Sequence, residues 1–182
     1  MVDRCARSMV RLLMSDLRFR EAMKELQIQT SVKVYSYDEL EPELARLVDM
    51  AKAKTQDAYC PYSNFHVGAA ALLADGQVIT GANQENAAYP SGLCAERVTL
   101  FAANANHPNT PVVALALACY THGHFTREVA SPCGACRQVM LETENRYGIP
   151  MKVILYCEEG CYVFDKASNL LPLCFAADSL ER

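Results

Sequence analysis

The chain has 182 residues, which is the length of one ordinary domain and enough to bury about 70% of the unfolded surface without disulfide bonds. A hydrophobic fraction of 51% and a charged fraction of 21% exclude a disordered, collagen-like or coiled-coil protein. The net charge of −4 disfavours binding to long nucleic acids, and no apolar run approaches the roughly 20 residues that a membrane span requires.

The first 22 residues differ in charge from the rest of the chain. They contain five arginines against three acids, so the acidic excess lies in residues 23–182. The acids argue against a mitochondrial targeting peptide. We expect residues 1–22 to form an N-terminal extension that is disordered or dispensable, and residues 23–182 to form a single domain.

The predicted elements begin with a helix over 42–57. Apolar residues recur with helical spacing from Leu40 to Ala51, and Pro42 stands where a helix begins. Asp75-Gly76, between two apolar runs, is a strong β-hairpin signal. In chain order, the other elements are strands over 65–74 and 77–82, a helix over 94–106, a strand over 111–120, a helix over 133–147, strands over 151–157 and 161–165, and a short helix from about Ala167.

The last two predicted strands are joined by only Glu158, Glu159 and Gly160. A parallel pair needs a crossover of roughly a dozen residues or more, so these strands must form an antiparallel hairpin. The order of the elements predicts an α/β fold in which helices pack on a mixed sheet.

Three of the nine cysteines suggest a metal site. Cys94 begins one predicted helix, and Cys133 and Cys136 lie in the first turn of another. Helix N-termini favour thiolates, and two cysteines one turn apart can hold one metal with Cys94 as the third ligand. Three protein ligands leave the fourth tetrahedral position of a zinc ion for water, which is typical of a catalytic site. The odd number of cysteines also fits free or metal-bound thiols in a reducing compartment.

Two charged residues follow Cys94 closely. Glu96 can lie beside the metal-bound water without being a ligand. Three thiolates leave a zinc site with a net charge of about −1, which weakens the pull of the metal on its water. A guanidinium such as that of Arg97 would offset this charge by donating hydrogen bonds to the thiolates.

A structural zinc site or a redox pair is the alternative interpretation. A structural site needs a fourth ligand, but it would leave Glu96 and Arg97 without a role, so we favour catalysis. The candidates for a fourth ligand are His122, His124, Cys157 and Cys161. Cys157 and Cys161 could instead form a second metal site, but we favour ordinary thiols there and a solvated loop at the two histidines.

The segments CAER and PCGACRQ together resemble the zinc-dependent nucleoside deaminases. The surrounding chain is similar to cytidine deaminases of the small homotetrameric type in PYSNFHVGAA (61–70), GANQENAAYPSGLCAER (81–97) and LLPLCF (170–175). The resemblance implies a three-layer α/β fold with a five-stranded mixed sheet, antiparallel last two strands and helices on both faces. Residues 23–182 would be a single zinc-dependent deaminase domain.

The resemblance also implies a role for each matching residue. One Zn²⁺ per chain would be bound by Cys94, Cys133 and Cys136, with Glu96 as the catalytic proton shuttle and Arg97 supporting the thiolates. The substrate-binding residues would be Phe65 against the pyrimidine, Asn83 and Glu85 at the ribose hydroxyl, the Ala95 amide and the Ser131 region at the polar edge of the base, and Tyr89 and Phe175 closing sites across subunit boundaries.

The implied activity is hydrolytic deamination of cytidine and 2′-deoxycytidine, in pyrimidine salvage, by a cytoplasmic homotetramer with shared active sites. A deaminase of another small aminated base, such as blasticidin S, guanine or a nucleotide, is an alternative, as is a non-enzymatic zinc module. Editing deaminases that act on polynucleotides are disfavoured, because the chain is acidic and the last strands of that class run parallel. We expect a nucleoside substrate, no nucleic-acid partner and no membrane association.

Overall fold

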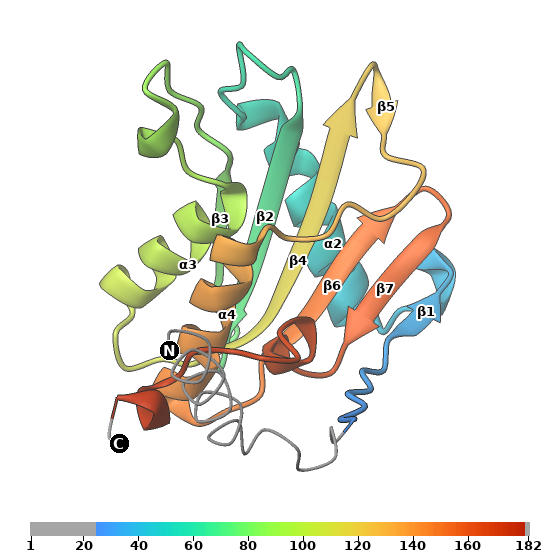
Figure 1. The fold of residues 1–182 in the computed structure, drawn as a ribbon. Coiled ribbons are helices and arrows are strands. Elements are labelled where there is room, and N and C mark those ends of the chain that lie inside the picture. The colour runs from blue at the N-terminus through green and yellow to red at the C-terminus, as the bar shows by residue number, and fades with distance from the viewer. Residues whose placement is uncertain (1–24, 181–182) are drawn as a thin grey trace, which may run out of the picture.

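Residues 25–180, which the computed structural model describes, form a central β-sheet with helices on both faces (Figure 1). The expected extension over residues 1–22 lies outside them. The strands are β1 (Lys33–Tyr35), β2 (His66–Leu73), β3 (Val78–Ala82), β4 (Val112–Thr121), β5 (His124–Phe125), β6 (Lys152–Cys157) and β7 (Gly160–Phe164). The helices are α2 (Pro42–Lys54), α3 (Ala95–Asn106) and α4 (Gly134–Tyr147), and 3₁₀ turns occupy Tyr37–Glu39, Thr55–Asp57, Tyr89–Ser91, Ala167–Leu170 and Ala177–Ser179.

The sheet is mixed, with the strand order β1-β7-β6-β4-β2-β3 and β5 beside β4. The pair β4–β6 is parallel, and α4 forms its crossover connection. The pair β6–β7 is antiparallel, with Cys157 opposite Gly160, which confirms the hairpin expected from the three-residue loop. The α/β class and the antiparallel last strands are therefore confirmed.

The strand count differs from the expected five. All five predicted strands are present, and the structure adds β1, with three residues, and β5, with two residues. Strands this short show no alternation of apolar and polar residues, so periodicity does not reveal them. The predicted C-terminal helix is the short 3₁₀ turn Ala167–Leu170, and the last turn of the first predicted helix is the 3₁₀ turn after Lys54.

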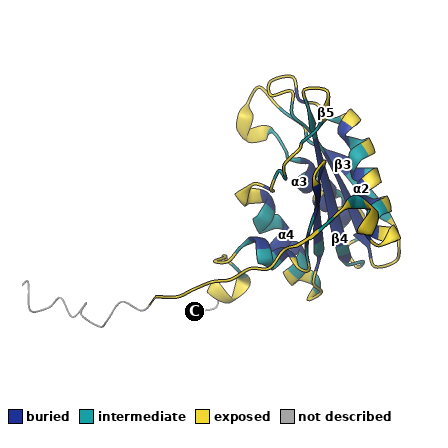
Figure 2. Ribbon diagram, turned by 90° about the vertical axis from the view of Figure 1, so that its right-hand side faces the viewer, coloured by how far each residue is buried: buried dark blue, intermediate teal, exposed yellow. Residues whose placement is uncertain are grey.

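Two hydrophobic cores lie on opposite faces of the sheet, which makes the fold three-layered. Alternate residues of β2 divide between them: Ala69, Ala71 and Leu73 face α3 and α4, whereas Ala70 and Leu72 face α2. Successive strand residues point to opposite faces, so a strand buried on both sides reads as a continuous apolar run. Figure 2 shows the buried strands between the partly exposed helices.

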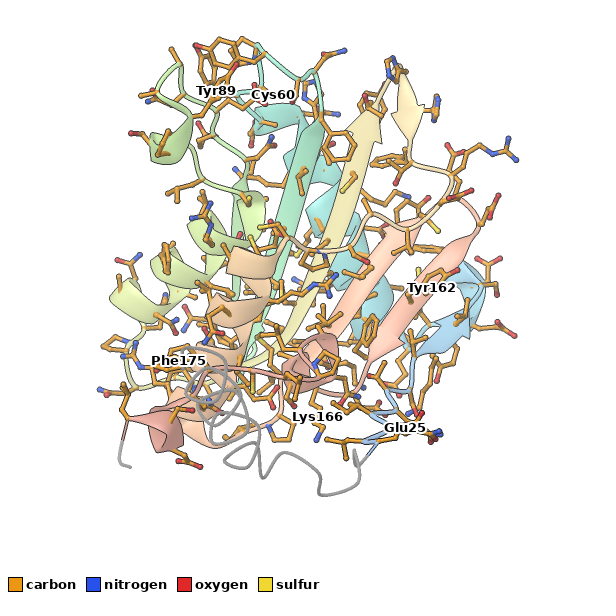
Figure 3. The ribbon with its side chains drawn as sticks, viewed as in Figure 1. Glu25, Cys60, Tyr89, Tyr162, Lys166 and Phe175 are labelled. Carbon is orange, nitrogen blue, oxygen red and sulfur yellow. The ribbon has the colours of Figure 1, made fainter. Side chains whose placement is uncertain are left out.

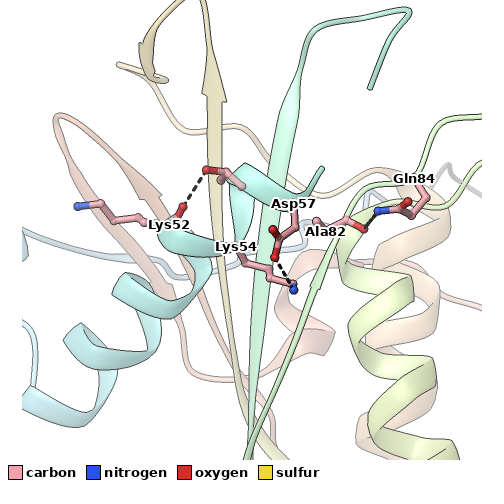
Figure 4. A network of polar contacts seen from close by, with 6 residues as sticks. Lys52, Lys54, Asp57, Ala82 and Gln84 are labelled. Atoms are coloured by element: carbon pink, nitrogen blue, oxygen red, sulfur yellow. Dashed lines mark hydrogen bonds and ion pairs between the residues drawn. The ribbon is translucent and has the colours of Figure 1, made fainter. Parts of the chain in front are cut away.

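Close packing at the end of α2 explains a glycine on β2. A Cβ atom at Gly68 would overlap the carbonyl oxygen of Ala51 and lie 2.7 Å from the amide nitrogen of Thr55. Just beyond, Lys54 Nζ pairs with Asp57 Oδ2 at 2.7 Å as the helix ends (Figure 4). The absence of a side chain at Gly68 therefore sets how closely α2 can approach the sheet.

Among residues 25–180, no helix combines the length and the apolar character needed to cross a membrane.

Candidate active site

Three cysteine thiols meet where the N-termini of α3 and α4 lie together. Cys94 is the N-cap of α3, Cys133 is the N-cap of α4, and Cys136 lies in the first turn of α4. The Sγ atoms of Cys94 and Cys133 are 3.9 Å apart, and those of Cys133 and Cys136 are 3.4 Å apart. Tetrahedral zinc with bonds of about 2.3 Å places its sulfur ligands about 3.8 Å from one another. The spacing of the three thiols therefore fits one zinc ion.

The thiol cluster has three members rather than four. Among the described residues, Cys94, Cys133 and Cys136 are the only group of three or more potential ligands with their ligating atoms within 4.8 Å of one another. Cys157 and Cys161 are buried on the hairpin β6–β7, and the Cys157 thiol donates to the carbonyl oxygen of Gly160 at 3.3 Å. The closed, four-ligand arrangement of a structural zinc site is therefore not supported.

Arg97 lies against the thiol cluster from α3. Its Nη2 donates to Cys94 Sγ at 3.8 Å and to the carbonyl oxygen of Gly92 at 3.5 Å. A hydrogen bond with Cys136, followed by the contact from Arg97, lowers the pKa of Cys94 to about 5. The same bond with Cys94, together with burial, raises the pKa of Cys136. The cluster thus favours a thiolate at Cys94, beside the guanidinium.

Glu96 is buried at the second position of α3, with only 5% of its surface exposed. Burial is the largest effect on this carboxyl group, and it raises the pKa. A carboxyl group with a raised pKa can accept and return a proton near neutral pH more readily than an exposed one. The burial and raised pKa of Glu96 therefore suit a general acid and base.

A cavity of about 420 Å³ brings most of the expected residues together. Glu96, Cys94 and Cys133 lie in its wall, and the other expected lining residues are Phe65, Asn83, Glu85 and Ser131. An adjoining cavity of about 510 Å³ shares Ser63, Asn83, Glu85 and Cys94 with the first and also contains Tyr62, Tyr89 and Arg97. The two cavities meet along the segment that contains Asn83 and Glu85.

Asn83 and Glu85 are held in place by backbone groups. Asn83 Nδ2 donates to the carbonyl oxygen of Phe65, and the amide of Val67 donates to Asn83 Oδ1, both at 2.8 Å. Glu85 Oε2 accepts from the amides of Tyr62 at 2.9 Å and Ser63 at 3.3 Å. Hydrogen bonds from Ser63 and the Tyr62 amide hold the pKa of Glu85 below its ordinary value. Both side chains are therefore pre-positioned in the cavity wall.

The remaining expected residues lie apart from the thiol cluster, or contribute only backbone. Ala95 is the buried first residue of α3. Tyr89 is 77% exposed and belongs to the second cavity, where its ring packs edge-to-face on Tyr62. Phe175 is 59% exposed and lines neither cavity. Figure 3 shows Tyr89 near the top of the view and Phe175 well below it on the left.

The cavity also has lining residues from the sheet, which were not predicted from the sequence. Leu117 and Cys119 on β4 and Val67 on β2 line it. Leu117 and Cys119 lie two positions apart on an apolar strand, so they face the same side of the sheet. The same spacing is equally typical of residues in the core of any sheet. Burial, followed by the charge of Glu96, raises the pKa of Cys119 to about 12, so this thiol stays neutral beside the carboxyl group.

Comparisons with known proteins match this site. A model of the family described as "Cytidine and deoxycytidylate deaminase zinc-binding region" matches residues 42–150. The chain is similar to a cytidine deaminase of Halalkalibacterium halodurans, at 42% identity over 74% of this chain and 96% of the relative. It is 38% identical to a cytidine deaminase of Sporosarcina psychrophila, over 76% of this chain and 96% of the relative.

Solved structures show the same fold. The cytidine deaminase structure from Burkholderia pseudomallei aligns with a TM-score of 0.61 and 43% identity, covering 71% of this chain and 97% of that one. The structure from Mycobacterium tuberculosis aligns with a TM-score of 0.59 and 34% identity, covering 75% of this chain and 99% of that one. The similarity covers nearly the whole of both solved chains.

Proposed function

This chain belongs to the cytidine and deoxycytidylate deaminase family, and we propose that it hydrolyses cytidine and 2′-deoxycytidine to uridine and deoxyuridine with release of ammonia. The observation that carries the proposal is the position of Glu96, buried beside three thiols in a cavity of about 420 Å³. The same cavity contains the polar side chains of Asn83 and Glu85. Relatives named cytidine deaminase, matched over most of their length, support the choice of cytidine over another aminated base.

Cys94, Cys133 and Cys136 would hold one zinc ion, because their sulfur spacing suits tetrahedral coordination and a family model for a zinc-binding region covers them. A zinc ion held by three thiolates supplies Lewis acidity that makes water nucleophilic near neutral pH. Arg97 would withdraw negative charge from Cys94 Sγ, from 3.8 Å, and so preserve this acidity.

Glu96 would move the protons of the reaction. It would take a proton from the attacking water and deliver it to N3 of cytosine while the water oxygen bonds to C4. It would then pass the second proton of that water to the exocyclic amino group, whose bond to C4 breaks to release ammonia. Burial of Glu96 raises its pKa above that of an exposed carboxyl group, which makes the carboxylate a better acceptor of the proton from water.

The other cavity residues would orient the nucleoside. Phe65 would stack against the pyrimidine, and the Ala95 amide and Ser131 would face its polar edge. Asn83 has one further amide hydrogen, and Glu85 has its Oε1 atom, beyond the bonds that hold them to backbone. A ribose hydroxyl can accept from the first and donate to the second.

We propose that the active enzyme is a homotetramer with shared sites. Phe175 is exposed and lines neither cavity of its own chain, and Leu173, two positions earlier, is also exposed. Tyr89 is exposed at the rim of the second cavity. Burial of these apolar side chains against a neighbouring subunit would remove them from water and complete the neighbour's cavity.

We also propose that residues 23–182 form the single deaminase domain and that residues 1–22 are dispensable. Every residue assigned a role lies between Phe65 and Phe175, and the family model matches 42–150. The free thiols fit a reducing compartment, so we place the enzyme in the cytoplasm.

The decisive experiment measures ammonia release from cytidine, 2′-deoxycytidine and blasticidin S, before and after removal of metal by a chelator. We expect one zinc ion per chain, deamination of the first two substrates, loss of activity on chelation and recovery with added zinc. Zinc-containing protein that releases no ammonia from either nucleoside would refute the proposal. Two zinc ions per chain would instead direct attention to Cys157 and Cys161.

A further inference from the structure

The side chain of Arg137 connects two parts of the molecule that lie far apart in sequence. It lies in the first turns of α4, next to Cys136. Its Nε donates to the carbonyl oxygen of Pro132 at 2.8 Å, and its Nη1 donates to the carbonyl oxygen of Leu170 at 3.1 Å. Within residues 25–180 no ion pair includes Arg137. Its guanidinium therefore donates hydrogen bonds to two backbone carbonyl oxygens.

The first acceptor belongs to the wall of the catalytic cavity. Pro132 is buried and directly precedes Cys133, and residues 130–133 all line the cavity. The bond from Arg137 fixes the orientation of the peptide that leads into Cys133. Groups that orient a metal ligand from behind contribute to metal affinity and to catalysis without touching the metal.

The second acceptor begins the segment that ends at Phe175. Leu170 is buried at the end of the 3₁₀ turn Ala167–Leu170. The next residue of α4, Gln138, donates from Nε2 to the carbonyl oxygen of Phe175 at 2.8 Å. Two adjacent side chains of α4 thus hold residues 170–175, which we name the C-terminal segment, at its two ends.

The shape of the guanidinium suits this connection. Arginine presents several donors in a rigid planar fork, whereas lysine presents one ammonium group on a flexible chain. Here two different nitrogens of one planar group, Nε and Nη1, bond the Pro132 and Leu170 carbonyls, and a lysine side chain has only one nitrogen. The arrangement therefore favours arginine over lysine.

We propose that Arg137 is a positioning residue that couples the wall of the catalytic cavity to the C-terminal segment. The part of this inference that concerns the segment rests on the proposed function, in which Phe175 completes the cavity of a neighbouring subunit. Arg137 then links the geometry of its own site to that of the neighbour. Loss of the fork affects zinc retention through Cys133 and substrate affinity through Phe175 at the same time.

The test compares zinc release and steady-state kinetics in the zinc-loaded enzyme. A colorimetric chelator measures zinc release without any need for activity. We expect Arg137→Met and the milder Arg137→Lys to release zinc roughly 10- to 100-fold faster than the unchanged enzyme, the range found when supports of metal ligands are removed. Both variants should also show a raised KM for cytidine.

Two variants on the same helix serve as matched controls. Gln138→Ala frees the C-terminal segment but not Pro132, so it should raise KM and leave zinc release unchanged. Arg146→Met removes an arginine whose Nη2 also donates to a backbone carbonyl, that of Pro108 at 3.1 Å, and it should change neither quantity.

Three results would overturn the inference. Zinc release by both Arg137 variants at the rate of Arg146→Met would remove the link to Cys133. Faster zinc release without a rise in KM would remove the link to the C-terminal segment. Faster zinc release from Gln138→Ala, in which both Arg137 bonds remain possible, would show that the C-terminal segment affects the zinc site by a route other than Arg137. Zinc release is measured on the unreacted protein, so the first and third results do not depend on which nucleoside is the substrate. Only the KM comparison rests on the proposed function.

Discussion

Glu96 illustrates how one residue acquires its chemistry from its position. A glutamate at the second position of a helix is common, and by itself it predicts only a favourable interaction with the helix dipole. Here the side chain is 5% exposed, lies in the wall of a cavity that Leu117 and Cys119 also line, and has its pKa raised by burial. The same carboxyl group on the surface of α3 would lack the burial that raises the pKa here.

Replacement of this carboxyl group tests its role most directly. We expect Glu96→Gln to retain the fold and one zinc ion per chain but to lose about 10²- to 10⁴-fold in kcat, the usual contribution of a general acid or base. The amide has nearly the same shape and cannot carry the proton. Zinc content and ammonia release should be measured together, with the exposed Glu128→Gln as the control. Near-normal turnover in zinc-loaded Glu96→Gln would remove Glu96 from the mechanism.

At the scale of elements, the approach of α2 to β2 depends on Gly68. A methyl group there would meet the backbone of Ala51 and Thr55, which cannot rotate away as a side chain would. We expect Gly68→Ala to lower the free energy of unfolding by about 1–3 kcal/mol, as overpacking does. Gly134→Ala is the control, because no atom lies within 4 Å of a Cβ at that position and its φ is not positive. Thermal unfolding of both variants would decide the point, and equal melting temperatures would contradict it.

The end of α4 holds the start of the C-terminal region through Glu144. Its Oε2 accepts from the amides of Ala167 at 2.6 Å and Met151 at 3.4 Å, and its Oε1 accepts from Ser168 Oγ at 3.1 Å. We expect Glu144→Gln to destabilise the protein by about 1–3 kcal/mol, because hydrogen bonds to a charged acceptor are lost or weakened. The exposed Glu142→Gln, on the same helix, should have no comparable effect in denaturant titrations. Equal midpoints for the two variants would show that Glu144 is not a structural anchor.

At the scale of the whole molecule, the exposed Phe175 ties activity to assembly. If it completes a neighbour's cavity, Phe175→Ala should raise KM for cytidine roughly 2- to 10-fold, as expected for an aromatic contact worth about 0.5–1.5 kcal/mol. Zinc content should not change. Val34→Ala is the matched control, because Val34 is similarly exposed (57% against 59%) but lies on the edge strand β1.

Light scattering on the same samples tests the assembly itself. We expect the unchanged protein to be a tetramer at the concentrations used for kinetics. A fully active monomer would refute the shared-site arrangement, and it would leave the deaminase assignment intact because Glu96 and the three thiols belong to one chain.

Much of the fold and the core of the site could be predicted because their signals are local. A three-residue loop permits only an antiparallel hairpin between β6 and β7. Cys133 and Cys136 are one helical turn apart, so their shared direction follows from helix geometry. β1 and β5 escaped prediction because two or three residues contain no detectable period, and pairing with a neighbouring strand defines them.

The sequence by itself thus determined the class of fold and the antiparallel last hairpin, and it predicted three cysteine thiols and a nearby carboxyl group as the candidate site, because the order of the elements, the three-residue loop and the motifs around these residues can be read along the chain. Only the tertiary structure decided how these groups meet. It brings Cys94 to 3.9 Å from Cys133 across 39 positions and buries Glu96. It also places the Asn83 side chain where it accepts a hydrogen bond from the amide of Val67 on β2. Arg137 in turn donates to the carbonyl oxygens of both Pro132 and Leu170. Contacts between such distant residues arise from the packing of helices against the sheet, and local spacing contains no information about that packing.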